Sequence, residues 1–108
     1  MFGKKNRYSF KRGVPKQIFA THFFVLRYQQ PSQVGFTCAV VVGKKVDKRA
    51  VIRNKIKRKI VEEIQKLSKE QPINSEMVLF AKKDIIKLEK AQISEELRKT
   101  FITTHIHS

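Results

Sequence analysis

Basic side chains crowd one short stretch of the chain, and the chemistry that they could perform is the binding of phosphate. Residues 44–59 hold nine lysines and arginines but a single acid, Asp47. The candidate anion-binding residues in this stretch are Lys44, Lys45, Lys48, Arg49, Arg53, Asn54, Lys55, Lys57 and Arg58. A solvated helix face usually mixes the two signs of charge at a spacing of four residues. Here the signs are segregated, which favours an anion-binding surface over ordinary solubilising charge.

The element that carries these cations is expected to be a helix whose charges oppose its own dipole. Apolar residues recur every three or four positions, which predicts an amphipathic helix from about Ala50 to Leu67. Cations fill its first half, whereas Glu62 and Glu63 lie in its second half. The dipole disfavours each such charge by a few tenths of a kcal/mol, up to about 1 kcal/mol. A local rule broken in this way indicates a functional site.

A helical projection separates the cations of this helix. Arg53 falls at the edge of the apolar stripe, one turn before Lys57, so both side chains can line a groove between the helix and a sheet. Arg58 is expected to point away from that groove. The free N–H groups at the start of the helix would add to the anion site.

The net charge indicates the class of partner. The chain has 24 lysines and arginines against 9 acids, a net charge of +15, and the entire excess lies in residues 1–59. Such an asymmetry predicts an extended anionic partner, for which nucleic acid fits best. The alternative is a generically soluble basic protein. No apolar run reaches the roughly 18 to 20 residues that a membrane span needs, so no membrane partner is expected.

Residues that could perform catalysis are sparse. Adjacent Glu62 and Glu63 would point about 100° apart on a helix and cannot act as one acid–base pair. His105 and His107 could share a metal ion but have no third ligand nearby. Cys38, within an apolar run, is typical of a small core residue. We therefore identify no catalytic residue and no metal-binding residue.

The remaining composition predicts one cytoplasmic domain over residues 1–108. The single cysteine cannot form an internal disulfide, and residues 1–13 lack the apolar segment of a secretory signal.

The order of elements predicts an α/β sandwich. A basic arm over residues 1–13 precedes two or three strands, which include residues 22–30 and 34–43. The second of these strands is apolar enough to be central in a sheet. A strand at 77–81 follows the basic helix, and Ser94 is a plausible N-cap of a last helix with Glu95 and Glu96 in its first turn.

The central stretch carries a resemblance to a known family. Residues 43–58, GKKVDKRAVIRNKIKR, look like the signature of the protein subunit of bacterial ribonuclease P, with Gly43 where that family usually has Ser. The likeness continues through residues 6–13, 24–26 and 79–83 and thus covers nearly the whole chain. One departure is that the segment between Arg7 and Phe10 is several residues short, so the first helix of the family must be abbreviated or frayed.

The resemblance implies both a fold and a function. The fold would be a ribosomal protein S5 domain 2-like sandwich, an α+β arrangement of an about four-stranded mixed sheet with two long helices, the abbreviated N-terminal helix and a left-handed crossover. The function would be that of the non-catalytic protein subunit of ribonuclease P. Its RNA subunit hydrolyses precursor tRNA with Mg²⁺ that the RNA mainly binds. The nine residues named above would be RNA-binding, with one protein copy expected per RNA.

The resemblance also implies a groove for the single-stranded 5′ leader of precursor tRNA. Single strands are held by cations together with aromatic faces, and the candidates for this groove are Phe10, Phe24, Arg27, Arg53 and Lys57. Of Phe23 and Phe24, one is expected in the core and the other in the groove. Arg27 stands where relatives often carry an aromatic residue.

Two other functions compete with this one. A general or ribosomal RNA-binding module would use the same fold class without a role in tRNA processing. An autonomous metal-dependent nuclease would need catalytic groups that the sequence does not offer. A DNA-binding helix is less favoured, because no partner helix precedes the basic one. The oligomeric state of the free protein stays open.

Overall fold

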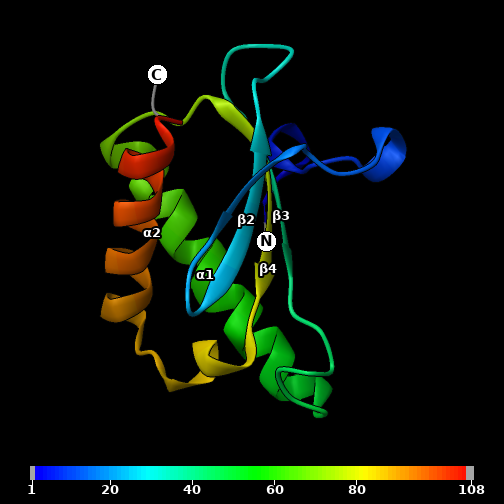
Figure 1. The fold of residues 1–108 in the computed structure, drawn as a ribbon, viewed down its shortest axis with the longest axis vertical. Coiled ribbons are helices and arrows are strands. Elements are labelled where there is room, and N and C mark those ends of the chain that lie inside the picture. Colours follow the sequence, from blue (N-terminus) through cyan, green and yellow to red (C-terminus); the bar gives the residue numbers. More distant parts are fainter. Residues whose placement is uncertain (1, 107–108) are drawn as a thin grey trace.

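A mixed four-stranded sheet with two long helices on one face forms the fold (Figure 1). The computed structural model describes residues 2–106, so His107 lies outside the described residues. The strands are β1 (Gln17–Ala20), β2 (Phe24–Gln29), β3 (Phe36–Val41) and β4 (Ser75–Ala81), and the helices are α1 (Ala50–Glu70) and α2 (Lys90–Thr104). The predicted α+β class, the mixed sheet and the basic helix are thereby confirmed.

The strand order β1-β2-β4-β3 gives the sheet its mixed character. β1 and β2 form an antiparallel hairpin, β2 pairs antiparallel with β4, and β3 pairs parallel with β4. Parallel neighbours need a long connection, and here α1 provides it. The expectation that the 34–43 segment is central was wrong, because β3 is an outer strand and β4 lies inside. Apolar residues indicate that a strand is buried, but they do not indicate its place in the sheet. The helices cover one face of β3, although no full strand pairs with its outer edge.

The N-terminal arm, residues 2–16, partly covers that edge. It forms two three-residue 3-10 turns, η1 (Lys4–Asn6) and η2 (Phe10–Arg12), which confirms that the first helix is abbreviated. The Asn6 side chain donates to the carbonyl of Phe36 at 2.8 Å, and the Tyr8 N–H donates to the carbonyl of Cys38 at 3.1 Å. In Figure 1 the arm, drawn in blue, lies across the sheet from α2.

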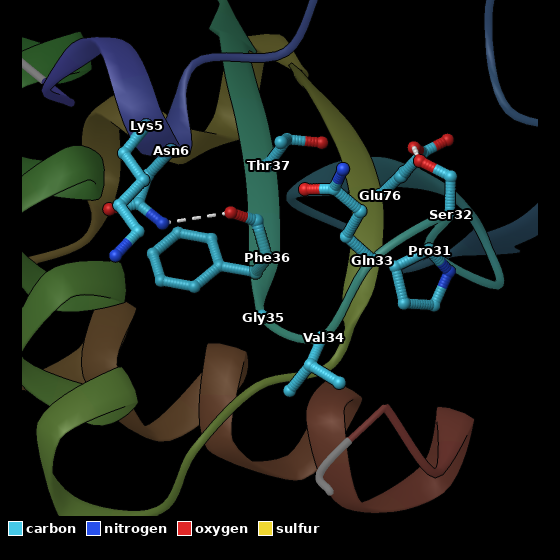
Figure 2. Close-up of a pocket in the computed structure, with 10 residues that line it drawn as sticks. All are labelled: Lys5, Asn6, Pro31, Ser32, Gln33, Val34, Gly35, Phe36, Thr37 and Glu76. Carbon is cyan, nitrogen blue, oxygen red and sulfur yellow. Dashed lines mark hydrogen bonds between the residues drawn. The ribbon is translucent and has the colours of Figure 1, made fainter.

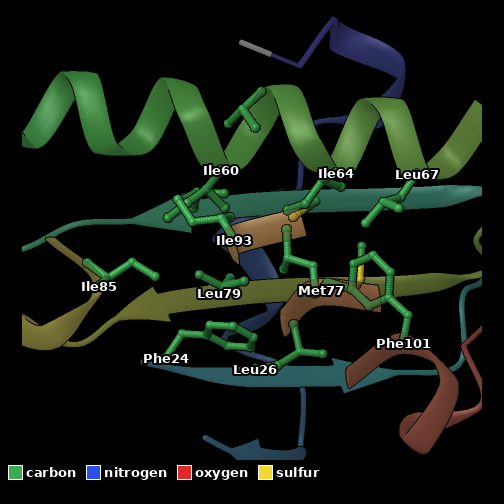
Figure 3. Packing of buried hydrophobic residues seen from close by; sticks show 14 of the residues in the cluster. Phe24, Leu26, Ile60, Ile64, Leu67, Met77, Leu79, Ile85, Ile93 and Phe101 are labelled. Carbon is green, nitrogen blue, oxygen red and sulfur yellow. The ribbon is translucent and has the colours of Figure 1, made fainter. Parts of the chain in front are cut away.

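The core lies between the helices and one face of the sheet (Figure 3). Residues at alternate positions of the strands face it, among them Phe24, Leu26, Met77 and Leu79, each at most 1% exposed. Alpha-helical spacing brings Ile56, Ile60, Ile64 and Leu67 of α1 onto them, and Ile93, Leu97 and Phe101 of α2 complete the cluster. Burial of this apolar surface is the main force that orients both helices.

The last helix begins earlier than its sequence suggests. α2 starts at Lys90, where Glu89 is the N-cap and forms a capping box with Gln92. Ser94 is therefore not the cap, and Glu95 and Glu96 are not in the first turn. The expectation failed because a capping box usually opens with Ser or Thr, whereas here a glutamate performs that role.

Replacing Phe24 by alanine tests its place in the core. We expect Phe24→Ala to lower the free energy of unfolding by about 3–5 kcal/mol, since the change leaves a large buried cavity. Chemical denaturation measures this loss. The matched control is Ile18→Ala on β1, whose side chain is 59% exposed and should change stability by no more than about 0.5 kcal/mol. An unchanged stability in Phe24→Ala, with weaker RNA binding, would return this residue to the groove.

Candidate nucleic-acid interface

The basic motif, residues 44–59, consists of a loop and the first half of α1, and Arg53 holds that loop in place. Arg53 Nη1 donates to the carbonyls of Asp47 at 3.1 Å and of Lys48 at 2.7 Å. These contacts turn the guanidinium back along its own helix toward the loop. The predicted position of Arg53 in a groove beside the sheet is therefore wrong: the projection gave the direction of its Cβ, and the long side chain finds its acceptors elsewhere. Arg53 instead fixes the loop that carries Lys44 and Lys45.

Asp47 is engaged by a neighbouring arginine. Its Oδ1 accepts from the Arg49 backbone N–H at 2.8 Å and from Arg49 Nε at 3.0 Å, while its Oδ2 accepts from Arg49 Nη2 at 2.9 Å. These hydrogen bonds from Arg49, side chain first and backbone second, lower the pKa of Asp47 to about 2. The one acid of the motif is thus committed to one cation, and Arg49 is the member of the set whose charge is already compensated.

The other cations of the motif have no such acid beside them. Among residues 2–106, the ion pairs of α1 all lie in its second half, where Glu62 and Glu63 meet Lys90 and Glu70 meets Arg98. Apart from Arg49, the polar and basic side chains left exposed in the loop and the first half of α1 are Lys44, Lys45, Lys48, Asn54, Lys55, Arg58 and Lys59. The acids of α1 therefore form their ion pairs with α2, and the first half of α1 carries uncompensated positive charge.

A hollow of about 340 Å³ lies at the edge of β3 between the arm and α1. Two of the five predicted groove residues, Phe10 and Lys57, line it, together with Phe2 of the arm and residues 38–41 of β3. Phe10 is 49% exposed, which leaves much of its ring available for stacking. The hollow thus combines an aromatic face, a cation and an apolar floor.

Two predicted groove residues lie elsewhere. Phe24 is 1% exposed and points into the core, so it cannot contact a ligand, and Phe23 is the half-buried member of the pair. Arg27 is on the face of the sheet away from the helices, where its Nε donates to the carbonyl of Pro15 at 2.9 Å. It anchors the arm and does not line the hollow. Alternation along β2 places Phe24 and Arg27 on opposite faces of the sheet, but it could not tell which face the helices cover.

Sequence reasoning missed Tyr8 and Arg7, which also line the hollow. The ring of Tyr8 packs edge-on against Phe10 with 5.2 Å between centroids, and its hydroxyl donates to the carbonyl of Gly13 at 2.8 Å. Gly13 has φ of +84°, a conformation that favours glycine. The alternation of cations and aromatics from Arg7 to Lys11 was the signal that could have indicated this part of the site.

Other kinds of site find little support in the described part of the chain. Within residues 2–106, no three histidine, cysteine or acidic side chains gather as a metal ion would need. No described helix is long and apolar enough to cross a bilayer. Burial raises the pKa of the Cys38 thiol, so this cysteine is a poor nucleophile.

Known proteins with the same sequence pattern and fold share one description. A family model described as Ribonuclease P matches residues 5–105. The ribonuclease P protein component of Mycoplasma mycoides subsp. mycoides SC is 29% identical over 85 residues, which are 78% of this chain and 77% of that protein. The structure of the RNase P protein from Staphylococcus aureus has a TM-score of 0.73 at 22% identity, covering 85% of this chain and 84% of its own. The RNase P protein from Thermotoga maritima gives 0.69 at 19% identity, covering 78% and 79%.

The pairing of Asp47 and Arg49 predicts a titration. In Arg49→Gln, the pKa of Asp47 should rise from about 2 toward the ordinary value of about 3.9. Carboxyl-carbon NMR measures it, and Arg98→Gln, which removes a remote pair, should leave it unchanged. Because the folded pKa is the lower one, this pair stabilises the wild type above about pH 4, and the contribution disappears as pH falls toward about 2. An unshifted Asp47 in Arg49→Gln would show that another group lowers its pKa.

Proposed function

We propose, from the premise that this chain belongs to the ribonuclease P protein family, that it binds ribonuclease P RNA and the 5′ leader of precursor tRNA. In that role it assists the Mg²⁺-dependent removal of the leader and does not itself cut RNA. The observation that carries the proposal is the uncompensated positive charge of the loop and the first half of α1. An outside anion can balance it, because the described acids of α1 form their ion pairs with α2.

Two surfaces divide the binding in this proposal. The exposed cations from Lys44 to Arg58 contact the RNA subunit, where Lys and Arg neutralise phosphates in a sequence-independent way. The hollow beside β3 takes part of the single-stranded leader, with Phe10 for base stacking and Lys57 for a phosphate. The two surfaces share α1, so this one helix holds the leader beside the RNA subunit.

The chain itself is poorly suited to hold Mg²⁺. This ion prefers carboxylate, phosphate and water oxygens, and the only carboxylate of the loop and basic half-helix, Asp47, is engaged by Arg49. We therefore assign Mg²⁺ to the RNA subunit. The contribution of the lysines and arginines is to reduce repulsion between the phosphates of the two RNAs, which lowers the metal concentration needed to bring them together.

The remaining parts of the proposal follow from this role. One protein copy per RNA is expected, in the cytoplasm, where precursor tRNA and the RNA subunit meet. The competing function is a general or ribosomal RNA-binding module with the same surface charge. A preference for substrates that carry a leader separates the two, because phosphate contacts alone would not distinguish precursor from mature tRNA.

Reconstitution with a bacterial ribonuclease P RNA tests the proposed function. We expect the protein to lower the Mg²⁺ concentration at which precursor tRNA is cleaved and to tighten binding of precursor over mature tRNA. Cleavage rates across a magnesium titration, with and without protein, measure the first effect. Protein alone should cleave nothing. Cleavage by protein without RNA, or no effect at low Mg²⁺, would refute the proposal.

The salt dependence of RNA binding tests the cationic half of α1. Each phosphate contact contributes about one unit to the slope of log affinity against log salt. Arg58→Ala should therefore reduce the slope for the RNA subunit by about one unit. Lys66→Ala removes an equal charge from the second half of the same helix and should leave the slope unchanged. Arg53→Ala should weaken binding too, since Arg53 holds the loop. Equal slopes for Arg58→Ala and the wild type would remove Arg58 from the interface.

A further inference from the structure

A polar row crosses the sheet on the face away from the helices. Glu76 of β4 lies opposite Gln29 of β2 on one side and Thr37 of β3 on the other. Because its neighbour Met77 points into the core, the Glu76 side chain points to the other face. The next positions on this face are Arg27, Val78 and Ala39, of which Val78 is fully buried. Three hydrogen-bonding side chains are thus gathered at one end of this face.

Two adjoining hollows surround Glu76, with volumes of about 150 and 270 Å³. Both are lined by Glu76, Ser32 and Thr37. Figure 2 shows these three side chains among the residues that line the smaller hollow. Cations of the arm line them as well: Lys5 in the smaller, and Arg7 and Lys11 in the larger. The larger hollow also shares Arg7 and Tyr8 with the hollow beside β3. A strand that occupies the groove at Phe10 would reach Glu76 by passing over Arg7 and Tyr8.

The carboxylate of Glu76 retains capacity to bind. Oε1 accepts from Gln29 Nε2 at 2.6 Å, and Oε2 accepts a long hydrogen bond from Ser32 Oγ at 3.5 Å. A carboxylate offers about four acceptor positions, and none of the described lysine or arginine side chains forms an ion pair with Glu76. Holding Gln29 and Ser32 in place would need only a neutral amide. A negative charge on a surface that attracts phosphate weakens the attraction, so its presence calls for a gain elsewhere.

We propose that Glu76 recognises an unpaired guanine of the leader as the strand crosses this face. The inference rests on the proposed function, because it requires the leader to enter the groove. Guanine presents two neighbouring N–H donors, on N1 and N2, which match the two oxygens of one carboxylate. Its O6 and N7 are acceptors, which suits the nearby Arg7 and Lys11. Unpaired bases are commonly read along this edge in single-stranded RNA.

The same geometry discriminates against the other bases. Adenine and cytosine each offer one amino group with an acceptor beside it, so one carboxylate oxygen would face an acceptor. Uracil offers one N–H between two carbonyls and is the least compatible. A phosphate is repelled by the carboxylate, which directs the backbone toward the cations of the arm. Glu76 would thereby set both the identity of the base and the side on which the phosphates run.

The test uses reconstituted holoenzyme and precursor tRNAs whose leaders are uracil except for one guanine at a varied position. Dissociation constants are measured at fixed salt for the wild type, Glu76→Gln and Glu95→Gln. The Glu95 variant makes the same charge change on α2, where Glu95 is exposed. We expect one leader position at which guanine binds roughly tenfold more tightly than uracil. Inosine there, which lacks the N2 amino group, should lose most of this preference.

The variants decide the role of the carboxylate. Glu76→Gln should reduce the preference at that position to less than about twofold, whereas Glu95→Gln should keep it. Thermal unfolding of Glu76→Gln checks its fold, and equal binding of inosine and guanine leaders by the wild type would overturn the inference even if that variant unfolds. A guanine preference that survives in folded Glu76→Gln would overturn the inference, as would a variant that binds every leader more tightly by one common factor.

Failure of this inference is distinguishable from failure of the proposed function. Precursor that binds more tightly than mature tRNA, with no preference among bases at any position, would overturn the guanine site and leave the proposed function standing. Precursor and mature tRNA that bind equally well would overturn both.

Discussion

The apolar stripe of α1 is the constraint on which the rest of the molecule depends. Burial of Ile56, Ile60 and Ile64 against the sheet fixes the rotation of the helix about its axis. The remaining faces must then carry every charge, and α2 packs beside the second half only, where it supplies Lys90 and Arg98 to the acids of α1. The first half extends past α2, and all of its charged residues are lysines or arginines. The charge arrangement that opposes the helix dipole is thus compatible with a stable fold, because the large apolar burial outweighs the few tenths of a kcal/mol that each misplaced charge costs.

The fold was predictable where periodicity is strong. The spacing of apolar residues in α1 correctly predicted a helix and its buried face. The aromatic and β-branched run of β2 correctly predicted a strand. The ends of the helices and the order of the strands in the sheet were harder to predict. The start of α2 depends on Glu89 acting as a cap, which its residue type rarely signals. The outer position of β3 depends on the path of the chain through α1, and a run of apolar residues holds no information about that path.

The site was predictable as a charge pattern and less so as a geometry. The exposed cations of the loop and of α1 follow from spacing alone. Phe24 was misplaced because alternation leaves the two faces of a strand equivalent until the helices dock on one of them. Arg53 was misplaced because the acceptors of a long side chain depend on the fold of a loop. Glu76 could not be identified from the sequence, because residues 60–108 have no net charge that would single it out. Only the register of β4 brings this acid beside the basic arm.

The attachment of the arm to β3 has a consequence for the free protein. An uncovered outer strand presents a row of N–H and carbonyl groups on which another chain can build a sheet, and this is a common route to aggregation. The bond from Tyr8 to Cys38 and the bond from Asn6 to Phe36 occupy part of that row. On the opposite edge, β1 has only four residues, and two copies would each carry a charge of +15. The short arm and the mutual repulsion of the two charges therefore both oppose edge-to-edge pairing of two copies.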